Sequence, residues 1–178
     1  ELIPASRVVL ACGHSARDTF ELVRDAGVRM EQKPFSVGVR IEHPQQLINR
    51  SQYGKAADHP ALDAADYKLS AHLPSGRGVY TFCMCPGGEV VCAASEPEGV
   101  VVNGMSRFAR DGQNANSALL VGVGPEDFDG EDPLAGINLQ REMEQAAYRT
   151  AVAANRIRRL RKPSATSWRI APAARASR

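Results

Sequence analysis

The sequence predicts a mixed α/β (α+β) domain, in which a strand–turn–helix unit leads into a β-rich region and a final helix. Three observations support this fold class. An apolar run at residues 8–10 is followed by a glycine and a helical pattern. Residues 36–42 alternate strictly between apolar and polar side chains, and short extended runs separated by Gly and Pro fill residues 79–123.

The first unit spans about residues 8–27. Its Val-Val-Leu run predicts a short strand that is buried on both faces. Gly13 permits a tight turn, Ser15 is expected to cap the next helix, and Gly27 is expected to end it. Free N–H groups at such a helix start can hold an anion, but strand–glycine–helix units are also common as purely structural features.

The next strand is predicted at residues 36–42, with Val and Ile on one face and polar residues on the other. Arg40 and Glu42 lie on that polar face, which we interpret as a solvated strand face. A short helix is expected at residues 45–50, followed by a polar surface connection at residues 52–66.

The remaining strands are predicted at residues 79–85, 89–94, 100–103 and 119–123. The first two are expected to form a hairpin across Gly87 and Gly88, and the third is expected to end in a turn at Asn103–Gly104.

The final helix is predicted to open at Asp132–Pro133, because Asp is a good cap and Pro suits the first helical position. Its apolar stripe is formed by Leu139, Met143, Ala146 and Ala147, and Arg141 and Glu144 lie on the other side.

Composition indicates a cytoplasmic globular protein of 178 residues, with 43% hydrophobic residues and no apolar run of transmembrane length. No secretory signal pattern opens the chain, and four unevenly spaced cysteines do not resemble a disulfide framework. All twenty acidic residues precede Arg149, whereas nine of the 22 basic residues lie from Arg149 onward. The sequence therefore divides into a mildly acidic domain and a basic tail.

Cys83 and Cys85 form the most suggestive local pair, since residues two apart on a strand share a face. They are interpreted as a redox dithiol, a partial metal site or two core-filling thiols, and the spacing favours the last. No metal site is expected, because His59 and His72 lie in loops without further ligands at suitable spacing. No catalytic acid–base pair stands out, so catalytic residues stay unassigned.

A series of sequence blocks resembles the central part of a bacterial family of FAD-dependent dehydrogenases. These are flavoproteins of the two-dinucleotide-binding type, described as NAD(P)/FAD-dependent oxidoreductases. The likeness runs in order over about residues 8–148. The blocks are VVLACGHSARDTFELV, KPFSVGVRIEHPQ, QYG, AADYKL, GRGVYTFCMCPGGEVV, EPEGVVVNGMS, ANSALLVGV and DPLAGINLQREME.

The resemblance implies that FAD is the cofactor, with NAD(P)H as a candidate electron donor and a small molecule of unknown identity as substrate. It implies no membrane partner. His14 either orients the flavin or substrate, or hydrogen-bonds the backbone of its turn. The resemblance places three segments near the flavin ring, and the candidate flavin contacts are Gly13, His14, Ser15, Cys85, Pro86, Gly87, Gly88, Asn103, Gly104 and Met105.

The family pattern also includes a G-x-G-x-x-G fingerprint upstream and a glycine-rich segment downstream, and neither occurs in this sequence. We therefore expect a flavoprotein fragment that is not active by itself and whose partners are the N- and C-terminal portions of the same protein. Its expected parts are a partial FAD-binding unit at residues 1–30, a substrate domain at residues 31–149 and a disordered tail at residues 150–178.

Two hypotheses account for the basic tail. In the first, it arises from out-of-frame translation, because a shifted reading of a GC-rich gene from Thr150 gives a peptide resembling the family's APAQ-x-VGDFL segment. In the second, which is the alternative to an enzyme fragment, the chain is a non-enzymatic domain whose arginine-rich tail binds nucleic acid. Nucleic-acid binding is the less favoured of the two.

Overall fold

The computed structural model describes residues 3–153 of the chain and confirms the α+β fold class. Helices, strands and two short 3-10 turns alternate in the order α1 (Arg17–Asp25), β1 (Phe35–Pro44), α2 (Gln45–Tyr53), η1 (Gly54–Ala56), β2 (Ser70–His72), β3 (Gly78–Cys85), β4 (Gly88–Cys92), β5 (Val102–Ser106), β6 (Asn114–Val123), η2 (Pro125–Asp127) and α3 (Ala135–Ala153).

The main sheet has four strands in the order β1-β6-β3-β2, and every neighbouring pair is antiparallel. β1 and β6 pair along their whole lengths, from Phe35 opposite Val123 to Pro44 opposite Asn114. The predicted strand is therefore present, and each of its residues shares a face with its partner on β6. Its burial differs from the prediction in the second half, where Val39 and Ile41 are 63% and 41% exposed whereas Arg40 and Glu42 are half-buried.

A separate two-stranded ribbon is formed by β4 and β5. The predicted hairpin between β3 and β4 is wrong, because β3 pairs with β6 and β2 and leaves β4 to pair with β5. The predicted turn at Asn103–Gly104 is also wrong. Both residues lie inside β5, where Gly104 is opposite Val90.

The first predicted strand is absent. Residues 8–10 are extended but unpaired, and Val8, Val9 and Leu10 are 83%, 90% and 62% exposed. A strand requires a neighbour for its backbone groups, and no strand among residues 3–153 lies beside this run. Its apolar composition alone was not sufficient evidence for a buried strand.

Helix α1 begins as expected after a turn in which Gly13 has a φ of +82°, and Gly27 follows it with a φ of +78°. The cap differs from the prediction, because Ala16 occupies the capping position and the Ser15 side chain forms no cap. The Asp18 carboxylate instead accepts a hydrogen bond of 2.9 Å from the Thr19 N–H.

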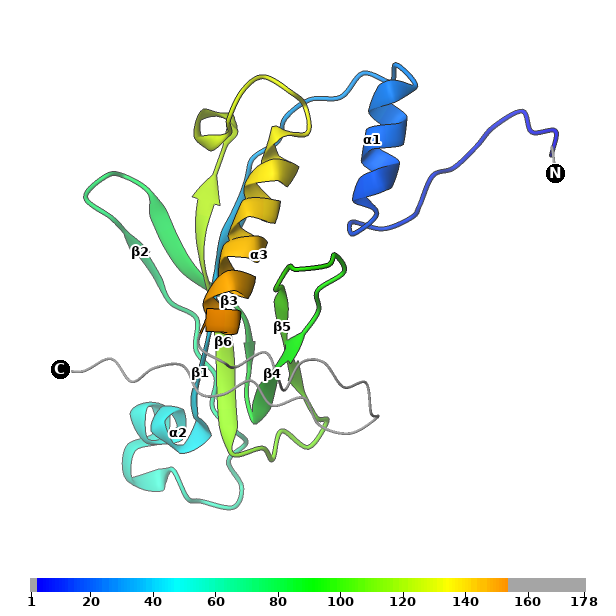
Figure 1. Ribbon diagram of the computed structural model, residues 1–178. Helices are drawn as coiled ribbons and strands as arrows, with labels where there is room; N and C mark the ends of the chain where they lie inside the picture. The colour runs from blue at the N-terminus through cyan, green and yellow to red at the C-terminus, as the bar shows by residue number, and fades with distance from the viewer. Residues whose placement is uncertain (1–2, 154–178) are drawn as a thin grey trace.

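Helix α3 lies in front of the sheet in Figure 1, with α1 beside its upper half and the β4–β5 ribbon below α1. Asp132 accepts a hydrogen bond of 2.7 Å from the Leu134 N–H and so caps the turn that leads into α3. The predicted orientation of α3 is wrong, since Met143, Ala146 and Ala147 are exposed whereas Arg141 and Glu144 face α1.

The buried core is small and consists mainly of small side chains. Ala65, Ala115 and Ala135 are at most 2% exposed, and the largest fully buried side chains are Asn116 and Ser117. Large apolar side chains such as Val39 and Phe82 remain 63% and 56% exposed. The centre of the core is therefore occupied by polar side chains, whereas large apolar side chains are usually the buried ones.

Residues 150–153 belong to α3, so the predicted tail begins inside a helix. Its remainder, and with it both hypotheses for the tail, lies outside the described residues. No helix between residues 3 and 153 has the length and apolarity needed to cross a membrane.

Candidate functional site

Polar side chains and two glycines, from five elements or their connecting turns, meet where the β4–β5 ribbon crosses the main sheet. We call this group the crossing cluster. It comprises Arg40, Glu42, Gln45, Cys85, Gly87, Gly104, Ser106, Asn114 and Asn116.

Arg40 lies at the centre of the crossing cluster. Its Nη1 donates hydrogen bonds to the Asn116 Oδ1 at 2.6 Å and to the Cys83 carbonyl oxygen at 3.0 Å, and it lies 4.0 Å from the Cys85 sulfur. A Cβ on Gly104 would lie 2.3 Å from the same Nη1. The same Cβ would lie 2.2 Å from the Asn116 Oδ1, so the arrangement of Arg40 and Asn116 leaves no room for a side chain at this position of β5.

Glu42 fastens the ribbon to the main sheet. One carboxylate oxygen accepts a hydrogen bond of 2.9 Å from the Val90 N–H, and the other accepts one of 2.7 Å from the Asn114 amide. Both oxygens are thus occupied. The predicted solvation of this strand face is wrong, because Arg40 and Glu42 are both half-buried. No Arg40 nitrogen lies within ion-pair distance of a carboxylate in residues 3–153.

Gln45, at the start of α2, holds the turn between β3 and β4. Its Oε1 accepts a hydrogen bond of 2.8 Å from the Gly87 N–H, and its Nε2 donates one of 2.8 Å to the Ala65 carbonyl. On the other side of the turn, the Ser106 hydroxyl donates one of 2.7 Å to the Pro86 carbonyl.

The glycines of this turn contact protein atoms. Gly87 has a φ of +55°, and a Cβ there would lie 2.0 Å from the Arg110 carbonyl oxygen. A Cβ on Gly88 would lie 2.6 Å from the Met105 carbonyl oxygen. Close packing of neighbouring chain segments therefore accounts for both glycines without a bound ring. Their role as flavin contacts stays a prediction.

The two cysteines of β3 lie at a bulge. Cys83 has a φ of +46°, and the register of β3 against β6 shifts between Phe82 and Cys85. Cys83 is exposed and Cys85 is half-buried, with its thiol 3.3 Å from the Cys83 carbonyl oxygen. The bulge disrupts the two-residue alternation that predicted a shared face for these cysteines. Within residues 3–153, no three His, Cys, Asp or Glu side chains gather to hold a metal ion.

Two predicted contact segments come together and the third does not. Gly104 and Met105 on β5 lie opposite Val90 and Glu89, next to the Cys85–Gly88 turn. Asn103 and Met105 have exposed side chains, with Met105 at 56%. Gly13, His14 and Ser15 are exposed and directly precede α1. Helix α1 contacts Glu96, in the loop that follows β4, whereas Gly87 lies at the opposite end of β4.

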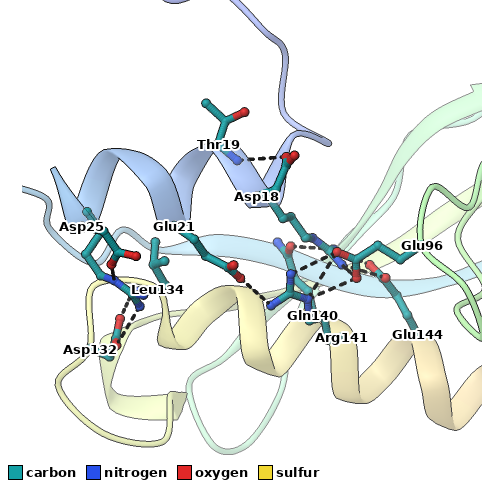
Figure 2. Close-up of polar contacts among 12 residues, drawn as sticks. Asp18, Thr19, Glu21, Asp25, Glu96, Asp132, Leu134, Gln140, Arg141 and Glu144 are labelled. Carbon is teal, nitrogen blue, oxygen red and sulfur yellow. Dashed lines mark hydrogen bonds and ion pairs between the residues drawn. The ribbon is translucent and has the colours of Figure 1, made fainter.

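Helix α1 is anchored by a network of ion pairs (Figure 2). Arg17, only 9% exposed, pairs with Glu96 at 2.8 Å and with Glu144 of α3 at 2.6 Å. Arg141 of α3 pairs with Glu96 at 3.1 Å and with Glu21 of α1 at 3.2 Å. Hydrogen bonds donated by Arg141 and then by Arg17 lower the pKa of Glu96. The hydrogen bonds that Arg17 donates to Glu144 and then to Glu96 raise the pKa of Arg17.

Two buried polar atoms lack hydrogen-bond partners among the described residues, and both lie near the crossing cluster. They are the Nδ1 of His43 and the Nδ2 of Asn116. Burial lowers the pKa of His43, whose ring lies 5.5 Å from that of Tyr67. Burial also raises the pKa of Tyr67. The surroundings of Asn116 are thus poorly solvated.

A separate open groove of about 460 Å³ lies at the start of β1 and the end of β6, lined by residues 34–36 and 122–126. It includes none of the predicted flavin contacts.

Sequence reasoning missed most of the crossing cluster. Arg40 and Glu42 were interpreted as solvent-facing, and Gln45, Asn114 and Asn116 were given no role. One signal was available: the members of the cluster come from four of the blocks that carry the family resemblance, at residues 33–45, 76–91, 96–106 and 115–123, or directly precede one. Their convergence needed knowledge of the strand order.

Comparison with known proteins gives two findings. Residues 34–162 match the family described as "FAD-dependent protein, C-terminal domain-like". An uncharacterised protein of Clostridium beijerinckii is 55% identical over 148 residues, which cover 83% of this chain and 28% of the relative. The chain thus spans little more than a quarter of that curated relative.

Proposed function

This chain belongs to the FAD-dependent protein, C-terminal domain-like family, and on that basis we propose that it is part of an FAD-dependent oxidoreductase. In this proposal, its crossing cluster faces the ligand of the flavoprotein. The chain spans 28% of its relative and contains no G-x-G-x-x-G fingerprint. We therefore assign the phosphates of FAD to other segments of the longer polypeptide.

One observation carries the proposal. Four sequence blocks that are far apart along the chain converge on one group of hydrogen-bonded polar side chains, in a molecule whose other buried side chains are mostly small and apolar. Buried polar groups are costly unless they are paired, and the Asn116 amide nitrogen has no partner here. Such groups are more typical of a binding site than of a structural core.

The proposed flavin contacts are the accessible members of the predicted set. On the ribbon, Asn103 and Met105 offer exposed side chains next to the Cys85–Gly88 turn. Near the other end of the ribbon, the turn from Gly13 to Ser15 is exposed. Apart from its chain neighbours, no described residue has an atom within 4 Å of a Cβ placed on Gly13. We propose that these two ends contact different parts of one extended dinucleotide.

The division of work follows from the chemistry of flavins. FAD supplies the electron transfer when it is bound, and the protein positions the ring and the substrate. In this chain, Gln45 and Ser106 fix the Cys85–Gly88 turn, and Arg40 presents a positive charge beside it. NAD(P)H as electron donor and a small organic substrate complete the proposal.

Titration with FAD, followed through flavin fluorescence, tests this proposal on the purified chain. We expect a saturable change in fluorescence and weak binding that is lost on dialysis, because only part of the dinucleotide site is present. Met105→Ala should reduce the change by removing an exposed apolar contact. Met143→Ala is the matched control, since Met143 is 43% exposed on α3. An equal response of wild type and Met105→Ala would reject Met105 as a contact.

A further inference from the structure

Arg40 differs from the other arginines that are buried or half-buried in residues 3–153. Each of the others has a carboxylate partner: Arg17 pairs with Glu96 and Glu144, Arg24 with Asp25 and Asp132, Arg77 with Asp127, and Arg141 with Glu21 and Glu96. Within the same residues, Arg40 contacts only neutral groups.

The guanidinium of Arg40 is held in a fixed position. Three elements fix its Nη1: β6 through Asn116, the β3 bulge through the Cys83 carbonyl, and β5 through the missing side chain of Gly104. Its Nη2 and Nε have no hydrogen-bond acceptor among the described residues. A planar guanidinium with a free edge is suited to bidentate binding of a carboxylate or a phosphate.

The surroundings offer donors but no free anion. Glu42 is the carboxylate closest in sequence, and both of its oxygens accept hydrogen bonds from the Val90 N–H and the Asn114 amide. The Asn116 Nδ2, on a side chain that is 0% exposed, is a second donor without a partner. A half-buried positive charge beside an unsatisfied donor is unfavourable unless an anion compensates it.

We propose that the free edge of Arg40, whose guanidinium is positioned by Asn116, forms the recognition point for an oxyanion, namely a carboxylate or phosphate group on a small molecule. The inference deepens the proposed function, because it rests on the crossing cluster facing the ligand of the flavoprotein. Its test contains no flavin, so failure here would leave FAD binding by the longer protein untouched.

Chemical footprinting of the wild-type chain tests the proposal directly. Phenylglyoxal modifies accessible arginines, and mass spectrometry gives the rate at each residue. We expect inorganic phosphate or acetate to slow modification of Arg40 by about threefold at twice its Kd, by simple mass action. Arg50, which is exposed on α2 and has no ion pair among the described residues, serves as the internal control. Sodium chloride at equal ionic strength controls for screening.

The two anions distinguish the sources of the oxyanion. Protection by acetate alone supports a ligand carboxylate, and protection by phosphate alone supports a phosphate-bearing ligand. Equal rates at Arg40 with phosphate, acetate and chloride would overturn the proposal.

A pair of variants provides an independent measurement. The bound anion should raise the melting temperature of wild type and of Arg50→Gln, but not that of Arg40→Gln, although both variants lose one positive charge. An equal rise in Arg40→Gln would also overturn the proposal. If Arg40→Gln does not fold, footprinting of the wild-type chain still decides the question.

Discussion

The Asn116 Oδ1 accepts a hydrogen bond of 2.6 Å from the Arg40 guanidinium. This bond satisfies one polar atom of the completely buried Asn116 side chain and leaves its Nδ2 without a partner among the described residues. Arg40 lies between the two sheets because Asn116 and the Cys83 carbonyl replace part of its hydration. At this scale, two polar side chains determine how close the ribbon and the sheet can approach.

Gly104→Ala tests this local geometry. The added methyl group would overlap the Asn116 Oδ1 and the Arg40 Nη1, so we expect a loss of stability of about 1–3 kcal/mol. The urea midpoint of unfolding measures it. Gly122→Ala, on β6 with no atom within 4 Å of the new Cβ, is the control and should be neutral or stabilising by about 0.5 kcal/mol. Equal midpoints for wild type and Gly104→Ala would refute the account.

Sequence reasoning had little power over the crossing cluster. The alternation of residues 36–42 correctly placed Arg40 and Glu42 on one polar face. It could not show that a ribbon crosses this face, because the pairing of β4 with β5 depends on contacts that are distant in the chain. Charged residues on a strand are usually exposed to solvent, but in this structure the ribbon covers Arg40 and Glu42.

At the scale of elements, α1 is held to α3 mainly by charge. Its contacts with the rest of the molecule include the pairs of Arg17 and Glu21 with Glu96, Glu144 and Arg141, whereas Leu22 on the same helix is 69% exposed. The interface between α1 and α3 should therefore respond to pH.

Glu96 gives the sign of this response. Its pKa is lower in the folded protein than the ordinary value, because Arg141 and Arg17 stabilise the carboxylate. The unfolded chain binds the proton more tightly, so this contribution is fully present above the ordinary glutamate pKa of about 4.3 and is lost as the pH falls through the lower folded value.

We therefore expect stability to decline in acid, with a smaller decline in Glu96→Gln, which has no carboxyl group to protonate at that position. Urea unfolding at a series of pH values measures both. Glu131→Gln, at an exposed residue with no ion pair in the described part of the chain, should retain the wild-type pH dependence. A Glu96→Gln profile parallel to wild type would show that the network contributes little.

The elements themselves were mostly predictable, but their partners were not. Helix α1 and strands β1, β3 and β6 follow from apolar periodicity and glycine positions. The prediction of a strand at residues 8–10 is wrong, because an apolar composition does not show whether a neighbouring strand is present. The predicted orientation of α3 is wrong, because the side of this helix that faces α1 carries Arg141 and Glu144, which form ion pairs with α1.

At the scale of the whole molecule, much apolar surface is uncovered. Val8, Val9, Val39 and Phe82 are each more than half exposed, so their side chains are available for contact with further parts of a longer polypeptide. The chain also spans only 28% of its relative. Together these facts agree with a domain that functions within a longer polypeptide, as we propose.

Hydrogen exchange of the complete Clostridium beijerinckii relative, with and without FAD, tests the central claim most directly. We expect FAD to protect the peptides that match residues 83–88 and 103–106, because these segments flank the crossing cluster. Peptides matching η1 (Gly54–Ala56), which contributes no residue to the crossing cluster, should exchange at the same rate in both states. Protection confined to other parts of the relative, with unchanged exchange in both segments, would contradict the assignment of the crossing cluster to the flavin site.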